Sequence, residues 1–270
     1  MCPRLIEIGP ITVYSFGLMM ALGFLTANYF LALELKRRKL DTAIANNIIL
    51  IGLIAGVVGS KILHLIEHWD QFVADPIREA FSPSGLTWYG GFILATLFIY
   101  LYARRIGVSF RVVSDAVSPG LLLGYGVARL GCHFAGDGDY GFPTNLPWGT
   151  DYSKGTYPPS HAFRPFPEIT SRFPNGIVPD STPCHPTPVY ELILCALFFA
   201  ILWRFRHRIK PDGAMFAWYL VLAGLERFLV EFFRINPRVV LGFSQAQLIA
   251  VILMVMGTLL LLHYRRVAVR

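Results

Sequence analysis

Long apolar runs separated by short polar stretches dominate the amino-acid sequence. Seven runs stand out, at roughly 11–35, 43–66, 86–104, 112–135, 188–204, 214–233 and 244–264. Each is close to the length of about 20 residues with which an α-helix crosses a bilayer. We therefore predict an all-α integral membrane protein with seven transmembrane helices, and we treat residues 1–270 as a single transmembrane domain.

The basic residues are shared unevenly among the polar stretches. Clusters such as Lys36–Lys39 and 204–210 alternate with stretches that hold few Lys or Arg. With the N-terminus outside, fourteen of the 24 Lys and Arg residues fall in inner stretches, and seven fall in much longer outer stretches. Because Lys and Arg concentrate in cytoplasmic loops, this pattern predicts an outer N-terminus and a cytoplasmic C-terminus.

Composition agrees with lipid as the surrounding solvent. Hydrophobic residues make up 54% of the chain and charged residues 15%, whereas a soluble domain carries about a quarter charged residues. The net charge is +7, but the basic residues form short clusters at helix ends with no interleaved aromatic platform. We therefore expect the membrane bilayer, and no nucleic acid, as a partner.

The four cysteines indicate neither a metal site nor redox chemistry, because the sequence has no Cys-x-x-Cys pair. Cys195 lies in an apolar run and is expected to pack inertly. Cys132 and Cys184 both fall on the predicted outer side, which leaves a disulfide between them open.

One outer stretch, about 136–187, is too long for a passive connection and is rich in Gly, Pro, Asp and Ser. Long irregular loops are usually functional or disordered, and the aromatic and proline content here favours an ordered cap. Elsewhere, small residues recur at helical spacing, which predicts close helix packing. They are Gly52, Gly56 and Ser60 in the second segment and Gly120 and Gly124 in the fourth.

Charged residues inside the predicted spans are the main functional candidates, because such residues are costly in lipid. Arg227, Glu231 and Arg234 follow i, i+4, i+7 spacing, and Arg129 lies at similar depth in the outer half. Arginine offers a planar fork of donors that matches phosphate oxygens, so Arg129 and Arg227 together predict a phosphate site. In the structural alternative Arg129 pairs with Glu231, and for Arg234 we favour a side chain that extends to the surface.

Five stretches of the chain resemble the signature of the prolipoprotein diacylglyceryl transferase family. They occur in order and span nearly the whole sequence. The stretches are Gly9-Pro10 with Phe16–Met19, Trp88–Gly91, Gly126–Asp137 with Tyr140-Gly141, His185–Glu191, and Glu226–Arg234.

The resemblance implies a transferase of the bacterial inner membrane whose active site faces the periplasmic side. The family moves the diacylglyceryl group of phosphatidylglycerol onto the cysteine thiol in the lipobox of a prolipoprotein, which forms a thioether and releases glycerol phosphate. This reaction begins bacterial lipoprotein maturation. The resemblance implies no metal and no organic cofactor.

The resemblance also implies roles for single residues. Arg129 and Arg227 become phosphate ligands, Glu231 orients one of them, and Asp137 and Tyr89 join them as catalytic residues. The substrate-binding candidates are Arg129, Phe16, Gly90, Gly91, His133, His185, Tyr190 and Glu191.

Three positions depart from the family pattern. Many members have His where this chain has Tyr89, Tyr where it has Phe16, and Asn where it has Cys132. Tyrosine has a reference pKa near 10 and is a weak base, so His133 or His185 could replace the missing histidine. The identity of the catalytic base therefore stays open.

Two other functions compete with this interpretation. One is a related lipid-modifying transferase that uses another lipid or another acceptor. The other is a lipid transporter, which is expected to have a midplane site, broken helices and internal repeats. The charges here lie on one side of the predicted membrane, which favours chemistry at the surface over transport.

Overall fold

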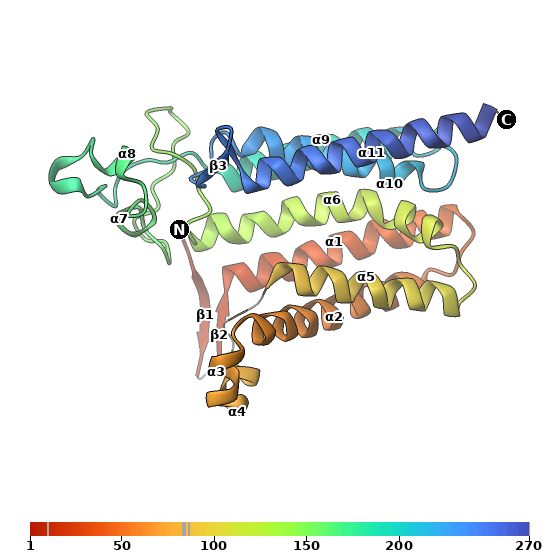
Figure 1. Cartoon of the computed structure of the whole chain (residues 1–270), viewed down its shortest axis with the longest axis horizontal. Helices are drawn as coiled ribbons and strands as arrows, with labels where there is room; N and C mark the ends of the chain where they lie inside the picture. Colours follow the sequence, from red (N-terminus) through yellow and green to blue (C-terminus); the bar gives the residue numbers. More distant parts are fainter. Residues whose placement is uncertain (10, 83–84, 86, 270) are drawn as a thin grey trace. The chain divides into compact units, whose positions relative to one another are not determined.

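The computed structural model describes residues 1–9, 11–82, 85 and 87–269. Pro10, Leu86 and Arg270, which the sequence predictions used, lie outside this set. Within it, seven long helices coincide with the seven predicted segments (Figure 1). They are α1 (Ser15–Arg37), α2 (Ala43–Glu67), α5 (Trp88–Arg105), α6 (Phe110–Ala135), α9 (Thr187–Phe205), α10 (Ala214–Val230) and α11 (Gln245–Val269).

Four of these helices are long and apolar enough to cross a membrane: α1, α2, α9 and residues Gln245–Arg266 of α11. Of the others, α10 has 17 residues, and α6 carries Asp115 and Arg129 within its length. On α11, Ile252 and Leu259 are 62% and 61% exposed, so this helix turns apolar side chains outward, as a helix in lipid does. The helical membrane character is thus confirmed, and seven spans remain a prediction.

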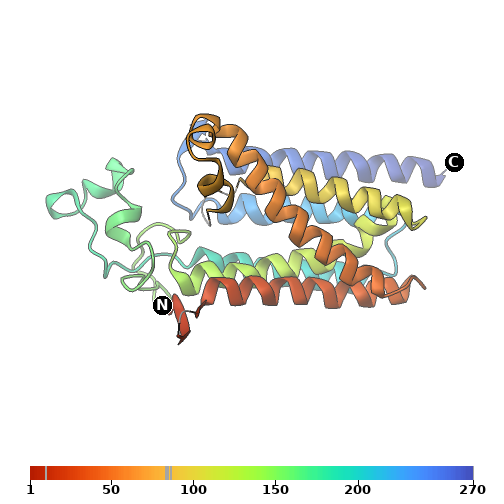
Figure 2. The same ribbon diagram turned by 90° about the horizontal axis from the view of Figure 1, so that it is seen from below.

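The chain divides into a smaller unit, Leu31–Ala116, and a larger unit, Met1–Phe30 with Val117–Arg270. In the larger unit, α1 and α6 lie side by side, and α10 packs against α9 and α11 (Figure 1, Figure 2). A Cβ on Gly124 would stand 2.6 Å from the carbonyl oxygen of Gly23, so the predicted close packing at Gly124 is confirmed. Leu122, Cys195, Phe198, Leu202 and Met215 form a buried core between α6, α9 and α10.

The predicted start of the first segment is wrong. Residues before Ser15 form an antiparallel hairpin of β1 (Arg4–Ile8) and β2 (Ile11–Tyr14). The run Ile11–Val13 is β-branched throughout, which suits a strand, and only its apolar composition made it look continuous with the helix. The backbone N–H of Cys2 donates to the carbonyl oxygen of Phe134 at 3.0 Å, which fastens the N-terminus to the end of α6.

In the smaller unit, α2 packs against α5 through small residues. Gly90 meets the backbone of Gly59, and a Cβ on Gly91 would lie 2.7 Å from the carbonyl oxygen of Gly56. This confirms the packing face predicted for the second segment. Two short helices, α3 (Trp69–Ala74) and α4 (Pro76–Phe81), follow α2.

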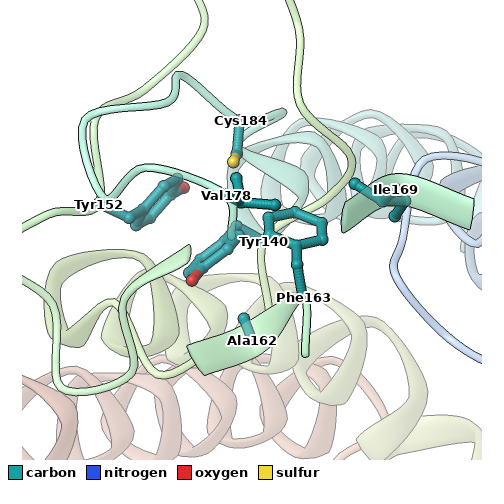
Figure 3. Close-up of a cluster of buried hydrophobic side chains, with 7 residues drawn as sticks. All are labelled: Tyr140, Tyr152, Ala162, Phe163, Ile169, Val178 and Cys184. Atoms are coloured by element: carbon teal, nitrogen blue, oxygen red, sulfur yellow. The ribbon is translucent and has the colours of Figure 1, made fainter. Parts of the chain in front are cut away.

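The segment 136–187 is an ordered lobe beyond the end of α6 (Figure 1). It contains α7 (Pro159–Ala162), α8 (Pro167–Thr170) and the 3-10 turn η1 (Pro174–Gly176). Its side chains form a core of their own (Figure 3). That core consists of Tyr140, Tyr152, Ala162, Phe163, Ile169, Val178 and Cys184.

The two cysteines of the possible disulfide are separate free thiols. Cys184 is fully buried in the core of the lobe, and burial raises the pKa of its thiol to about 12. It therefore stays protonated at neutral pH and serves packing. Cys132 is buried on α6 beside Arg129.

Candidate active site

Three arginines and three carboxylates meet in the larger unit, where α6, the start of α9 and the end of α10 converge. Equal numbers of both charges make the group neutral as a whole. We call it the Arg–carboxylate cluster: Arg129, Arg227, Arg234, Asp139, Glu191 and Glu231.

Glu191 lies at the centre of this cluster. It is fully buried, and Arg129 Nε donates to its Oε2. Arg227 Nη1 donates to its Oε1 at 3.0 Å, and Arg234 Nη1 lies 3.5 Å from the same oxygen. The hydroxyl of Tyr125 adds a hydrogen bond of 3.3 Å. One carboxylate thus holds α6, α9 and α10 together and orients three guanidinium groups.

Asp139 bridges two of the arginines from the lobe. Its Oδ2 accepts from Arg129 Nη1 and its Oδ1 from Arg234 Nη2, both at 2.6 Å. Burial alone would raise the pKa of Asp139, but the charges of Arg234 and Arg129 outweigh this and hold its pKa well below the usual range. Asp139 is therefore ionised at every physiological pH.

Glu231 is fully buried and pairs with Arg227 Nη2 at 2.7 Å, and Arg227 is one of the two arginines that it is predicted to orient. Asn236 and Ser244 also donate to Glu231 Oε1, at 2.6 and 2.7 Å. The hairpin of β3 (Arg238–Val240) and β4 (Phe243–Ser244) carries Ser244 to this position. Arg227 thus holds one carboxylate oxygen of Glu231, and Asn236 and Ser244 hold the other.

The prediction that Arg234 extends to the surface is wrong. Its side chain is 8% exposed and is paired with Asp139 and Glu191. Arg234 follows the end of α10, and its backbone bridges to Gly141 of the lobe. The N–H of Phe142 donates to the carbonyl oxygen of Phe233 at 2.9 Å, so the lobe holds this turn in place.

Asp137 is placed differently from Asp139. It accepts the backbone N–H of Asp139 at 3.3 Å, which shapes the turn after α6. Cys132, Asp137 and Asp139 bring potential metal-ligating atoms within 4.8 Å of one another. Because both oxygens of Asp139 already accept from arginines, this trio is poorly suited to a metal ion.

The candidate histidines lie at the edge of the lobe. Nδ1 of His133 lies 3.0 Å from the hydroxyl of Tyr152, and Nδ1 of His185 lies 3.1 Å from that of Tyr190. Burial lowers the pKa of His185, which keeps the imidazole neutral at pH 7. Tyr190 also accepts from Trp148 Nε1 at 2.9 Å.

The remaining candidates fall at helix contacts or in the other unit. Phe16 is the second residue of α1, and its backbone lies 3.1 Å from where a Cβ on Gly131 would stand. Tyr89, Gly90 and Gly91 belong to the smaller unit, where the space beside both glycines is filled by α2. Helix packing therefore explains why neither position has room for a side chain, and substrate binding by Gly90 and Gly91 stays a prediction.

Comparison with known proteins adds the decisive observation. The family described as Prolipoprotein diacylglyceryl transferase matches residues 3–263. The chain belongs to this family. Among curated phosphatidylglycerol–prolipoprotein diacylglyceryl transferases, that of Leptospira interrogans is 32% identical, with 93% of this chain and 89% of the relative aligned. That of Dehalococcoides mccartyi is 31% identical, with 98% and 94% aligned, and that of Clostridium tetani is 29% identical, with 88% and 87% aligned.

Sequence patterns in this diacylglyceryl transferase family member do not single out Asp139, and they indicate Glu191 only as a substrate-binding candidate. Asp137, two positions before Asp139, is the carboxylate that the sequence predicts to be catalytic. Glu191 is predicted to bind substrate, whereas in the structure it pairs with all three arginines. The signal for Glu191 was present, because a carboxylate that opens an apolar segment needs a partner. The sequence contains no comparable signal for Asp139.

Proposed function

We propose that this chain transfers the diacylglyceryl group of phosphatidylglycerol to the lipobox cysteine of prolipoproteins. Membership of the family carries the proposal, since the relatives' names state this transfer. In the reaction the C–S bond forms at a glycerol carbon while the C–O bond to the phosphate breaks. The thiol gives its proton to a base, and glycerol phosphate leaves. The two alternative functions, a transferase with another lipid or acceptor and a lipid transporter, are not supported by the names of these relatives.

The Arg–carboxylate cluster supports a phosphate site. Arg227 keeps 25% of its side chain exposed and Arg129 keeps 14%. Among the described residues, Arg129 Nη2 has no hydrogen-bond partner, so its two N–H groups are unused donors. We assign Arg129 and Arg227 to the phosphate that leaves, where fixed donors stabilise the charge that develops in the transition state.

The base remains a separate question. His185 is neutral and can accept a proton, and His133 lies on the last turns of α6 in the same unit. We propose that one of these imidazoles takes the thiol proton. Cys132 lies beside Arg129, and its Sγ accepts a weak hydrogen bond from Arg129 Nη1 at 3.1 Å. We assign it a packing role beside Arg129.

One assay tests the reaction. Purified full-length protein is incubated with phosphatidylglycerol and a lipobox peptide, and the peptide is examined by mass spectrometry. We expect a diacylglyceryl adduct on the peptide cysteine and none on a peptide with Ser in its place. An adduct with another lipid alone would support the related-transferase alternative, and lipid exchange without any adduct would support transport.

We propose seven spans with the N-terminus outside and the active site on the periplasmic face of the inner membrane. Cys2 is exposed, whereas Cys132, Cys184 and Cys195 are buried. The Cys2→Ser variant therefore has no exposed native thiol among the described residues, and single cysteines can be introduced into it for labelling. Lys154→Cys and Asp70→Cys are expected to react with an impermeant maleimide added outside, and His207→Cys only after lysis. Outside labelling of His207→Cys would overturn this topology.

Tyr89 stays a proposed substrate ligand. It is 47% exposed at the start of α5, so its hydroxyl is available to a lipid oxygen. We expect Tyr89→Phe to lose most activity in the lipobox-peptide assay and Tyr89→His to retain it. Trp88→Phe is the matched control, because Trp88 is a neighbouring exposed aromatic with no hydroxyl. A wild-type rate for Tyr89→Phe would leave Tyr89 as an ordinary interfacial aromatic.

A further inference from the structure

The C-terminal end of α2, in the smaller unit, carries a second cluster of titratable side chains: His64, Glu67 and His68. One ring nitrogen of each histidine and one oxygen of Glu67 lie within 4.8 Å of one another. The histidines stand four residues apart, which places both on one side of the helix end, and their ring centroids are 4.3 Å apart. None of the three belongs to the Arg–carboxylate cluster.

We propose that this cluster binds a divalent transition-metal ion, with zinc the expected occupant. Two imidazoles and one carboxylate form a ligand set that suits zinc, nickel or copper, whereas magnesium and calcium prefer oxygen ligands throughout. Three protein ligands leave a fourth position of a tetrahedral ion to water.

The hydrogen bonds around the ligands fit this use. Nδ1 of His68 lies 3.1 Å from the carbonyl oxygen of His64. A carbonyl only accepts, so Nδ1 carries the proton and Nε2 has the lone pair that a metal takes. Oγ1 of Thr87 donates to Glu67 Oε2 at 2.8 Å. Supporting contacts of this kind orient the ligands of established metal sites.

The geometry requires a small closing movement. Ligand atoms on tetrahedral bonds of 2.0–2.1 Å stand about 3.4 Å apart. Glu67 and His68 are exposed, so their side chains are free to adjust, while His64 is half-buried against Gly85. Unlike Asp139, Glu67 accepts here from a neutral hydroxyl, so no arginine competes with the ion for that contact. A bound ion would tie the end of α2 to the start of α5 through Glu67 and Thr87.

Metal binding to the purified full-length protein tests the site directly. The protein carries no polyhistidine tag, is stripped with chelator in detergent and is titrated with zinc chloride by calorimetry, then with cobalt to follow visible absorption. We expect one zinc per chain. Loss of a ligand in His68→Ala or Glu67→Gln should weaken binding by about 100-fold or more, and Thr87→Val by about 10-fold to 100-fold.

Two matched variants complete the test. His161→Ala and His207→Ala remove exposed histidines outside the cluster and should bind zinc like the wild type. Thr87 is the residue before α5 and makes no side-chain cap bond to the helix among the described residues. Thr87→Val therefore removes the contact to Glu67 and spares the helix start. Thermal unfolding in metal-free buffer checks that each variant is folded. Stoichiometric binding that survives His68→Ala and Glu67→Gln, or no stoichiometric binding at all, would overturn the site. Neither lipid nor peptide is used, so the outcome is independent of the proposed transferase reaction.

Discussion

Arg129→Ala and Arg227→Ala are each expected to lower the rate of diacylglyceryl transfer by about 100-fold to 1,000-fold, the usual loss for one transition-state donor. Both side chains belong to the Arg–carboxylate cluster and keep exposed or unused donors. The measurement is turnover in the lipobox-peptide assay, expressed per folded protein. Arg129→Lys should also lose much of the rate, because lysine keeps the charge and loses the planar fork.

The controls separate a catalytic role from a structural one. Arg164→Ala removes an exposed arginine of the lobe and should leave the rate unchanged. Arg234→Ala should cost less rate than Arg129→Ala or Arg227→Ala, because the Arg234 side chain is 8% exposed and faces protein carboxylates. If Arg129→Ala and Arg227→Ala remain folded and turn over at the wild-type rate, the phosphate site lies elsewhere.

The helices were readable from the sequence because lipid imposes a length and a composition on each of them. The hairpin β1–β2 was not, because its second strand, β2, leads directly into α1 and so belongs to the same apolar run. Two strands of five and four residues lack the long periodicity that identifies a helix.

The site was readable only in part. The stripe of Arg227, Glu231 and Arg234 follows from helical spacing, but the burial of Arg234 does not. Its partner Asp139 lies 95 residues earlier in the chain, and the lobe brings the two together through the bridge between Gly141 and Arg234. Such a contact depends on tertiary structure, which is why Asp137 and Asp139 could not be told apart by pattern alone.

The pairing of charges within the Arg–carboxylate cluster also explains why its three arginines can be largely buried. Each guanidinium contacts at least two protein carboxylates, so the cost of burying its charge is offset within the group. The same arrangement makes the cluster sensitive to the loss of any one carboxylate. Glu191 is the member on which all three arginines depend.

Glu191→Gln is therefore expected to destabilise the protein strongly. The substitution leaves three guanidinium groups to share Asp139 and Glu231, and breaking a buried ion pair from one side costs about 3–5 kcal/mol. For a chain of this size the apparent Tm should fall by about 10 °C, at roughly 2–4 °C per kcal/mol. Thermal unfolding in detergent, followed by tryptophan fluorescence at one fixed scan rate, measures the change.

Glu226→Gln is the matched control for this prediction. Glu226 is also a buried carboxyl, on the neighbouring helix α10, but its Oε1 has no hydrogen-bond partner among the described residues. Removing a carboxyl without such partners should change the Tm little or raise it. The double variant Glu191→Gln/Arg234→Gln restores charge balance, so its loss should be smaller than the sum of the two single losses. Equal Tm values for Glu191→Gln and Glu226→Gln, or strict additivity in the double variant, would show that Glu191 does not hold the arginines together.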